Sequence, residues 1–195
     1  MLLFHSIAGG WMLIGNITTT SQEQASSRTY LNARTFDLTD LGRLREGDTI
    51  LDGSLFQDLM QQQQAGQFRI FCTKPYHGRR FHVMSKRNEG GFQFRDYLLG
   101  KDVTWLHGPI SCTEALQSLP DDNSYLWQAC EANSPYIRSR AVGNVEARLY
   151  DHVLFEHGNL HVQLFGNQRL ECDDFQPKHA SRGYNQIGQW LYYVR

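Results

Sequence analysis

The residues best suited to chemistry or to binding lie in one segment, residues 68–97, which we call the basic segment. From residue 68 to residue 95 it contains seven cations and one anion, Glu89. These charges give the segment a net charge of +6, and because the whole chain carries −1, the remaining residues carry −7. Cations neutralise phosphates and flat aromatic rings stack on bases, so this composition is typical of surfaces that bind RNA or other single-stranded nucleic acid.

We interpret eight side chains of the basic segment as candidate contacts to nucleic acid or to an acidic partner. Because the net charge of the whole chain is close to zero, any such surface is expected to be a patch set against an acidic remainder. The competing interpretation is a solvated rim of cations that also protects an edge strand. The candidates are Arg69, Lys74, Tyr76, Arg79, Arg80, Lys86, Arg87 and Arg95.

Residues 91–97, Gly-Phe-Gln-Phe-Arg-Asp-Tyr, partly match the aromatic octet of the RNA-recognition motif. In that fold a helix separates the two aromatic strands, and residues 74–90 contain no helical pattern, which excludes the fold. The alternation of polar and aromatic residues predicts a strand over residues 92–98, with Phe92 and Phe94 on one face. Whether these two rings lie in the core or contact a ligand stays open, although alternate aromatics favour a buried face.

No established catalytic motif or metal-ligand pattern is present. The sequence lacks a G-x-S-x-G turn, a Walker loop and a glycine-rich dinucleotide turn, and the spacing of its eight histidines matches no metal site. We therefore expect no catalytic residue, no metal and no cofactor. Two catalytic alternatives stay open: a nucleophile at Cys72 or Cys130 with a histidine partner, and a histidine near residues 79–82 acting on an RNA 2′-hydroxyl.

The four cysteines stand 40, 18 and 42 residues apart, with no C-x-x-C pair. Dispersed cysteines in apolar surroundings are typical of reduced core residues, which predicts a cytoplasmic protein. Residues 1–15 are apolar but lack the cationic start of a signal peptide, and glycines interrupt them before they reach the length of a membrane span. We interpret them as a β-hairpin.

The elements that must position these residues are mostly short strands, which predicts a mainly β, α+β fold of antiparallel sheets or meanders. We expect one domain over residues 1–195, with a two-lobed organisation around a seam near residues 108–122 as a further option. One firm helix is predicted over residues 54–65, and a short one over residues 111–119, where Ser111 and Glu114 suit a capping box. Residues 125–132 fit either a strand or a helix.

Three further β segments are predicted: a hairpin that turns at residues 75–78, a meander over residues 145–172, and a closing strand over residues 187–195. In the closing strand, alternation places Trp190, Tyr192 and Val194 on one face and Leu191 and Tyr193 on the other. Both faces are apolar, so we expect one to meet the core and the other to meet a neighbouring element or subunit.

Four short pieces, residues 11–15, 33–36, 105–108 and 125–127, resemble the small accessory subunit of type III-D CRISPR effector complexes. The strands of that family carry a tryptophan near a glycine and an Ala-Arg-x-aromatic segment, as Trp11 to Gly15 and Ala33 to Phe36 do here. The resemblance implies a cytoplasmic, non-enzymatic subunit for antiviral defence that contacts large effector subunits and guide RNA.

We therefore predict a non-catalytic, protein- and RNA-contacting subunit of a larger ribonucleoprotein assembly, with no membrane contact. A small enzyme acting on RNA or on a phosphorylated substrate is the first alternative. A β-barrel that binds a small apolar ligand, with tryptophans lining its cavity, is the second.

Overall fold

The computed structural model describes residues 10–21, 34–36, 49–51, 66–98, 110–133, 136–137, 151–153, 160–163, 169–174 and 187–195. Three helices are seen within these ranges: α3 (Glu89–Leu98), α5 (Cys112–Ala115) and α6 (Tyr125–Asn133). None of the described helices is long and apolar enough to cross a membrane.

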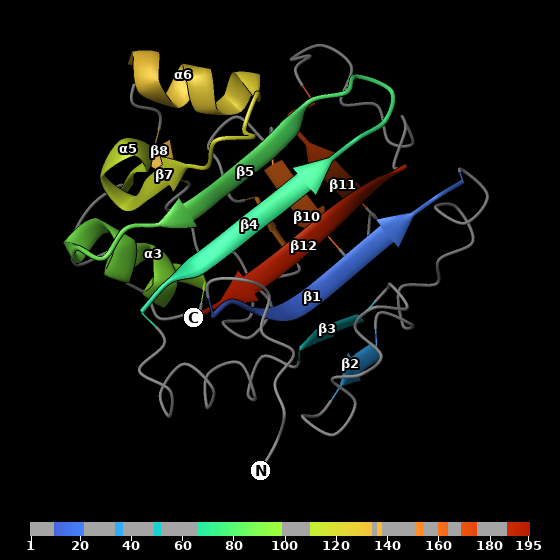
Figure 1. The fold of residues 1–195 in the computed structure, drawn as a ribbon, viewed down its shortest axis with the longest axis horizontal. Coiled ribbons are helices and arrows are strands. Elements are labelled where there is room, and N and C mark those ends of the chain that lie inside the picture. The colour runs from blue at the N-terminus through green and yellow to red at the C-terminus, as the bar shows by residue number, and fades with distance from the viewer. Residues whose placement is uncertain are drawn as a thin grey trace.

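A seven-stranded sheet dominates the described part of the chain (Figure 1). Its strands run in the order β2-β3-β1-β12-β4-β5-β7, and every neighbouring pair is antiparallel except β2 and β3. The fold is thus α+β and mainly β, as predicted. The strands are β1 (Met12–Thr19), β2 (Arg34–Phe36), β3 (Thr49–Leu51), β4 (Phe68–Thr73), β5 (Arg80–Ser85), β7 (Leu116–Ser118) and β12 (Gly188–Val194).

Two smaller sheets complete the described strands. The first has the order β11-β10-β9, is antiparallel throughout and lies behind the main sheet in Figure 1. This sheet confirms the predicted meander where the structure describes it. Its strands are β9 (Asp151–Val153), β10 (Leu160–Gln163) and β11 (Arg169–Cys172), and the second sheet pairs β6 (Ile110–Ser111) with β8 (Tyr136–Ile137).

The closing strand, β12, lies in the middle of the main sheet between β1 and β4. Trp190, Tyr192 and Val194 are buried in the core, as the alternation predicts, while Leu191 and Tyr193 lie on the opposite face. The prediction that this strand pairs within the sheet is confirmed.

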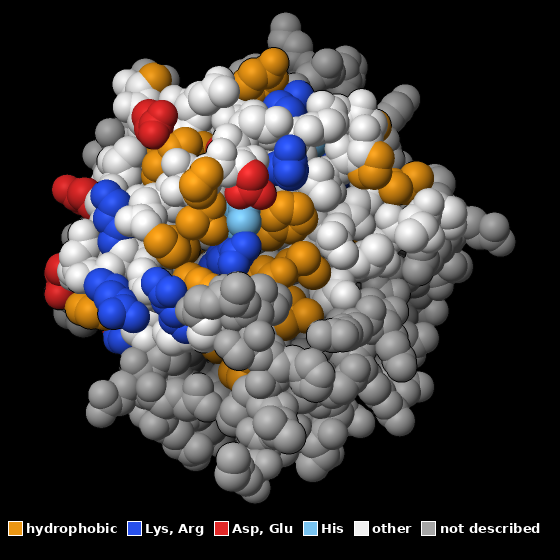
Figure 2. All heavy atoms as spheres, viewed as in Figure 1, with side chains coloured by type: hydrophobic (Ala, Val, Ile, Leu, Met, Phe, Trp, Pro, Cys, Tyr) orange, Lys and Arg blue, Asp and Glu red, His pale blue; other side chains and the backbone are white. Residues whose placement is uncertain are grey.

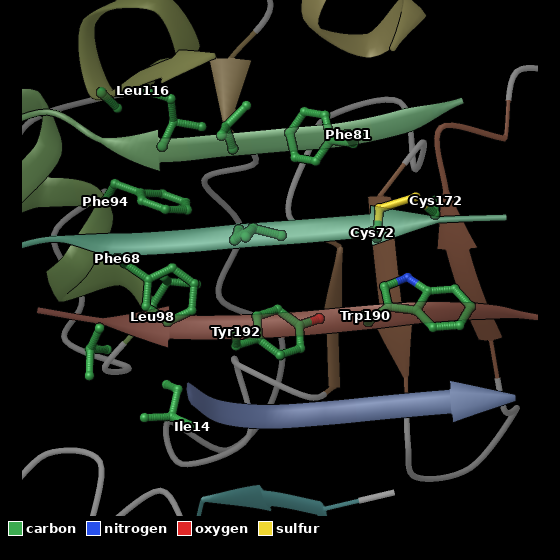
Figure 3. Packing of buried hydrophobic residues seen from close by; sticks show 14 of the residues in the cluster. Ile14, Phe68, Cys72, Phe81, Phe94, Leu98, Leu116, Cys172, Trp190 and Tyr192 are labelled. Carbon is green, nitrogen blue, oxygen red and sulfur yellow. A yellow bond between two sulfur atoms is a disulfide. The ribbon is translucent and has the colours of Figure 1, made fainter. Parts of the chain in front are cut away.

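The core fills the space between one face of the main sheet and the elements behind it (Figure 3). On β4, Phe68, Ile70 and Cys72 point into this core, whereas the residues between them are half-buried on the other face. Phe94 of α3 meets Phe68 edge to face, with ring centroids 6.3 Å apart. The inner face of the sheet therefore supplies the hydrophobic stabilisation.

Residues 89–98 form the helix α3, so the predicted strand over residues 92–98 is wrong. Asn88 caps the helix, because its Oδ1 accepts a hydrogen bond from the Gly91 amide at 2.9 Å. Helical spacing then buries Gly91 and Phe94 and leaves Phe92 exposed. A Cβ on Gly91 would lie 1.9 Å from the Lys86 carbonyl oxygen, so only glycine lets the helix approach so closely.

The predicted short helix over residues 111–119 is shorter in the structure. It ends after one turn, at Ala115, because residues 116–118 pair with β5 as β7. Ser111 makes no side-chain capping bond, and its Oγ lies 3.2 Å from the Thr113 Oγ1 instead. Residues 125–133 are helical, with the Ser124 Oγ accepting a hydrogen bond from the Trp127 amide.

The cysteines are paired in two disulfides, so the prediction of reduced thiols is wrong. Cys72 of β4 is bonded to Cys172 of β11, and Cys112 of α5 is bonded to Cys130 of α6. The first bond ties the main sheet to the three-stranded sheet, and the second ties two helices together. Sequence spacing could not indicate this, because each partner lies on a different element.

Two sequence-based predictions fall outside the described residues: the helix over residues 54–65 and the first strand of the hairpin in residues 1–15. The two-lobed organisation near residues 108–122 stays a prediction.

Candidate nucleic-acid interface

Four of the seven cations of the basic segment are paired with carboxylates. Lys74, although predicted to be a contact residue, is fully buried and pairs with Asp174. Arg79 pairs with Asp173 at 2.5 Å, and the exposed Arg80 lies 4.0 Å from Asp121. The fourth is Arg95, which lies 2.9 Å from Asp96. The positive charge visible in the sequence is therefore largely balanced in three dimensions.

Asp173 and Asp174 form a clamp that holds the turn between β4 and β5. The Asp174 carboxylate accepts a hydrogen bond from the Tyr76 hydroxyl at 2.6 Å, besides pairing with Lys74. Asp173 is buried and accepts hydrogen bonds from the backbone amides of Tyr125 and Leu126, so it caps helix α6 from outside the helix. Lys74, Tyr76 and Arg79 thus serve the fold.

Lys86 and Arg87 follow the end of β5, and Arg95 lies on α3. The Lys86 Nζ donates to the Thr113 carbonyl at 2.6 Å, and the Arg87 Nε donates to the Gln67 Oε1 at 3.1 Å. The Arg95 guanidinium also lies over the Phe92 ring, 5.2 Å from its centroid. Arg87 is exposed, whereas Lys86 and Arg95 are half-buried.

A different group of residues comes together on the side of the main sheet that faces away from the core, which we call the outer sheet face. Figure 2 shows histidine, basic and acidic side chains close together on this side, with hydrophobic side chains around them. Apart from His82 and Tyr193, its members are half-buried or exposed. They are Arg69, Phe71, Thr73, Arg80, His82, Met84, Gln189, Leu191 and Tyr193, which strand pairing places side by side.

His82 stands at the centre of a polar chain on this face. Its Nδ1 lies 2.5 Å from the Asp121 Oδ1, and its Nε2 lies 2.7 Å from the Arg69 Nε. An arginine Nε–H can only donate, so Nε2 must be the acceptor and Nδ1–H must donate to the carboxylate. His82 is therefore neutral in this arrangement.

Backbone hydrogen bonds fix the loop that carries Asp121. The Asp122 Oδ2 accepts from the His82 amide at 2.6 Å, and the Leu119 amide donates to the His82 carbonyl at 2.9 Å. The Asn123 amide donates to the Arg80 carbonyl at 3.1 Å. The Asp121 carboxylate is thus held against the imidazole by the edge of β5.

Aromatic rings hold the Arg69 guanidinium on the other side. Its Cζ lies 4.9 Å from the centroid of the Tyr193 ring and 5.8 Å from that of Trp11. Phe71 meets His82 edge to face, with centroids 5.1 Å apart. A cation flanked by flat rings on an extended sheet can bind phosphate and base together.

Of the eight candidates, the outer sheet face contains Arg69 and Arg80. Residues that were not among the candidates complete the face and its contacts, and those that bear on function are Phe71, His82, Tyr193 and, beside His82, Asp121. His82 lies within the basic segment, and the sequence pointed to it only as a possible general base near residues 79–82. No sequence pattern pointed to Asp121 as a site residue, because its partner His82 lies on another element, 39 residues away.

Burial lowers the pKa of His77 and His82 below the usual value of 6.5; for His82 the hydrogen bond to Asp121 opposes this shift and the Arg69 charge adds to it. Protonation of either histidine therefore favours the unfolded chain.

We expect the free energy of unfolding to be highest above pH 7 and to fall below pH 6.5, by at most about 1.4 kcal/mol per pH unit for each of these two histidines. Urea unfolding between pH 5 and 8 measures this. The slope should diminish in a His77→Gln, His82→Gln double variant, and an unchanged slope would contradict the prediction.

Within the described residues, no three histidine, cysteine, aspartate or glutamate side chains are grouped so that they could hold a metal ion. The absence of a metal or cofactor in the protein stays a prediction.

Comparison with known proteins gives no match to a family model, to a curated protein or to a solved structure.

Proposed function

We propose that this protein is a non-catalytic binding protein that contacts single-stranded RNA through its outer sheet face. One observation carries the proposal: Arg69, Phe71, His82 and Tyr193 lie side by side on the outer side of β4, β5 and β12. An open sheet presents such side chains in a plane, where unstacked bases can lie on rings while cations meet the backbone phosphates.

Within this surface, the side chains have different roles. Phe71 is half-buried and offers a ring to a base, while Arg80 is exposed at the start of β5 and can reach a phosphate. The Arg69 guanidinium packs against the rings of Tyr193 and Trp11 on the outer sheet face, where it can contact a phosphate. Of the eight candidates predicted from the sequence, the proposal thus keeps Arg69 and Arg80 on the sheet and leaves out those at the turn, after β5 and on α3.

The larger assembly in which the protein was predicted to serve stays a prediction, and so does the CRISPR resemblance. A cytoplasmic location was inferred from reduced cysteines, and two disulfides remove that premise, because structural disulfides are rare in a reducing cytoplasm. The proposal therefore concerns the RNA contact and not that assembly.

A second candidate function, RNA cleavage, is favoured by the Asp121–His82 pair. A carboxylate that orients a histidine is a common way to prepare a general base, which could take the proton of an RNA 2′-hydroxyl. Against this, the Nε2 that would accept the proton already accepts a hydrogen bond from Arg69. The other alternative, a closed barrel around an apolar ligand, gains no support from the main sheet, whose described strands are ordered from edge β2 to edge β7.

Fluorescence anisotropy with a labelled oligouridylate of about 12 nucleotides tests the proposal. Phe71→Ala should weaken binding about 5- to 150-fold, because loss of one base stack costs about 1–3 kcal/mol. Arg69→Gln should weaken it and reduce the dependence of log K on log salt by about one.

Arg95→Gln is the matched control, because Arg95 belongs to the basic segment but lies on α3 and pairs with Asp96. Equal losses in all three variants, or no binding by the wild type at low salt, would contradict the proposal. Gel analysis of the same samples separates the second candidate: RNA cleavage that disappears in His82→Gln would support an enzyme.

A further inference from the structure

The contact between Arg69 and His82 can exist in only one protonation state of the histidine. The Arg69 Nε–H donates to the His82 Nε2 at 2.7 Å, and the His82 Nδ1–H donates to Asp121. If Nε2 acquires a proton, two donors face each other and the hydrogen bond is lost. Two positive charges are then held close together, which is unfavourable without an anion between them.

We infer that protonation of His82 turns the Arg69–His82 contact into a site for a single oxyanion, and that the natural occupant is a phosphate group of the bound nucleic acid. An oxygen placed between the two side chains would accept from the His82 Nε2–H and from the Arg69 Nε–H. The occupant's identity rests on the proposed function, whereas the anion site itself does not.

The charged groups around His82 support the link between anion binding and protonation of this histidine. Asp121 faces Nδ1 and stabilises the imidazolium, while Arg69 on β4 and Arg80 on β5 oppose it. Asp122 contacts the backbone amide of His82, and the Phe71 ring packs beside the imidazole. An anion between Arg69 and His82 would offset the charge of Arg69, the larger of the two opposing effects, so it should favour protonation of His82.

Arg69 has the donors that such a site needs. Within the described part of the chain, the bond from its Nε to His82 is its one hydrogen bond, and its other contacts are to the faces of Tyr193 and Trp11. The guanidinium therefore has two terminal nitrogens to offer to an oxyanion, in the fork geometry that suits phosphate and sulfate.

Sulfate is the probe of choice, because its charge stays constant between pH 5 and 8. NMR titration of the His82 imidazole should show that sulfate raises the pKa of His82, since anion and proton binding are reciprocally linked. Sulfate affinity should fall about tenfold for each pH unit above that pKa. In Arg69→Gln the effect of sulfate on His82 should be lost, whereas Arg95→Gln should retain it. Sodium chloride at equal ionic strength controls for screening.

A His82 titration that sulfate does not move, or moves equally in Arg69→Gln, would overturn the anion site. The RNA measurement distinguishes the two proposals. If the wild type binds RNA but its RNA affinity depends on pH in the same way as that of His82→Gln, a phosphate of the RNA is not the occupant of the anion site and the proposed function stands. If sulfate and His82 are linked but no RNA binds at any pH, the proposed function fails and the anion site stands.

Discussion

Replacement of Asp173 with alanine is expected to lower the free energy of unfolding by about 3–5 kcal/mol. Asp173 is buried, pairs with Arg79 at 2.5 Å and accepts the backbone amides of Tyr125 and Leu126. Alanine would leave a partly buried guanidinium without its carboxylate and helix α6 without its external cap. The backbone at Asp173 also has a φ of 54°, which aspartate and asparagine tolerate better than alanine.

Urea unfolding at pH 7.5 measures this loss, and two variants control it. Asp173→Asn keeps an acceptor oxygen and the tolerance for positive φ, so it should cost less than Asp173→Ala. Asp96→Ala breaks a more exposed pair with Arg95 and should cost about 0–1 kcal/mol. A loss at Asp173 no larger than that at Asp96 would show that the clamp contributes little. In that case Arg79 would again be a candidate for RNA contact.

Removal of the Cys72–Cys172 disulfide is expected to cost about 2–5 kcal/mol. This bond joins residues 100 apart, whereas Cys112–Cys130 joins residues 18 apart. Because the entropy lost by the unfolded chain grows with the length of the closed loop, the long-range bond should contribute about 1.5 kcal/mol more than the short-range one.

Double alanine variants of each pair, unfolded in urea without reductant, measure the difference. All four cysteines are buried, so both variants remove similar side chains from the core. A free-thiol assay on the denatured wild type should find none. Four free thiols would contradict both bonds and would restore the premise for a cytoplasmic protein.

The candidate site was only partly visible in the sequence. The basic segment drew attention to residues 68–85, and Arg69 and Arg80 of the outer sheet face were among its candidates. Lys74 and Arg79 looked equally available, because the carboxylates that pair with them lie 100 and 94 residues further along the chain. A cation's availability depends on such distant partners, so charge counting along a segment overestimates the free positive surface.

The sequence by itself determined the features that depend on neighbouring residues. The hairpin around residues 75–78 predicted β4 and β5. The two faces of β12 were predicted because side chains of a strand point to opposite sides in turn. The turn at residues 75–78 was predicted from its proline and glycine, and Gly78 has a φ of 67° there, a conformation that glycine adopts without strain.

Only the tertiary structure decided the features that depend on distant contacts. Residues 92–98 alternate as a strand would, yet they are helical, because Phe94 packs on Phe68 of β4. The Asn88 cap and the close approach of Gly91 to the Lys86 carbonyl are local and support the same helix. The pairing of the cysteines and the meeting of His82 with Asp121 likewise join different elements. Local pattern fixes which way a side chain can point, but its partner is chosen by the packing of the whole chain.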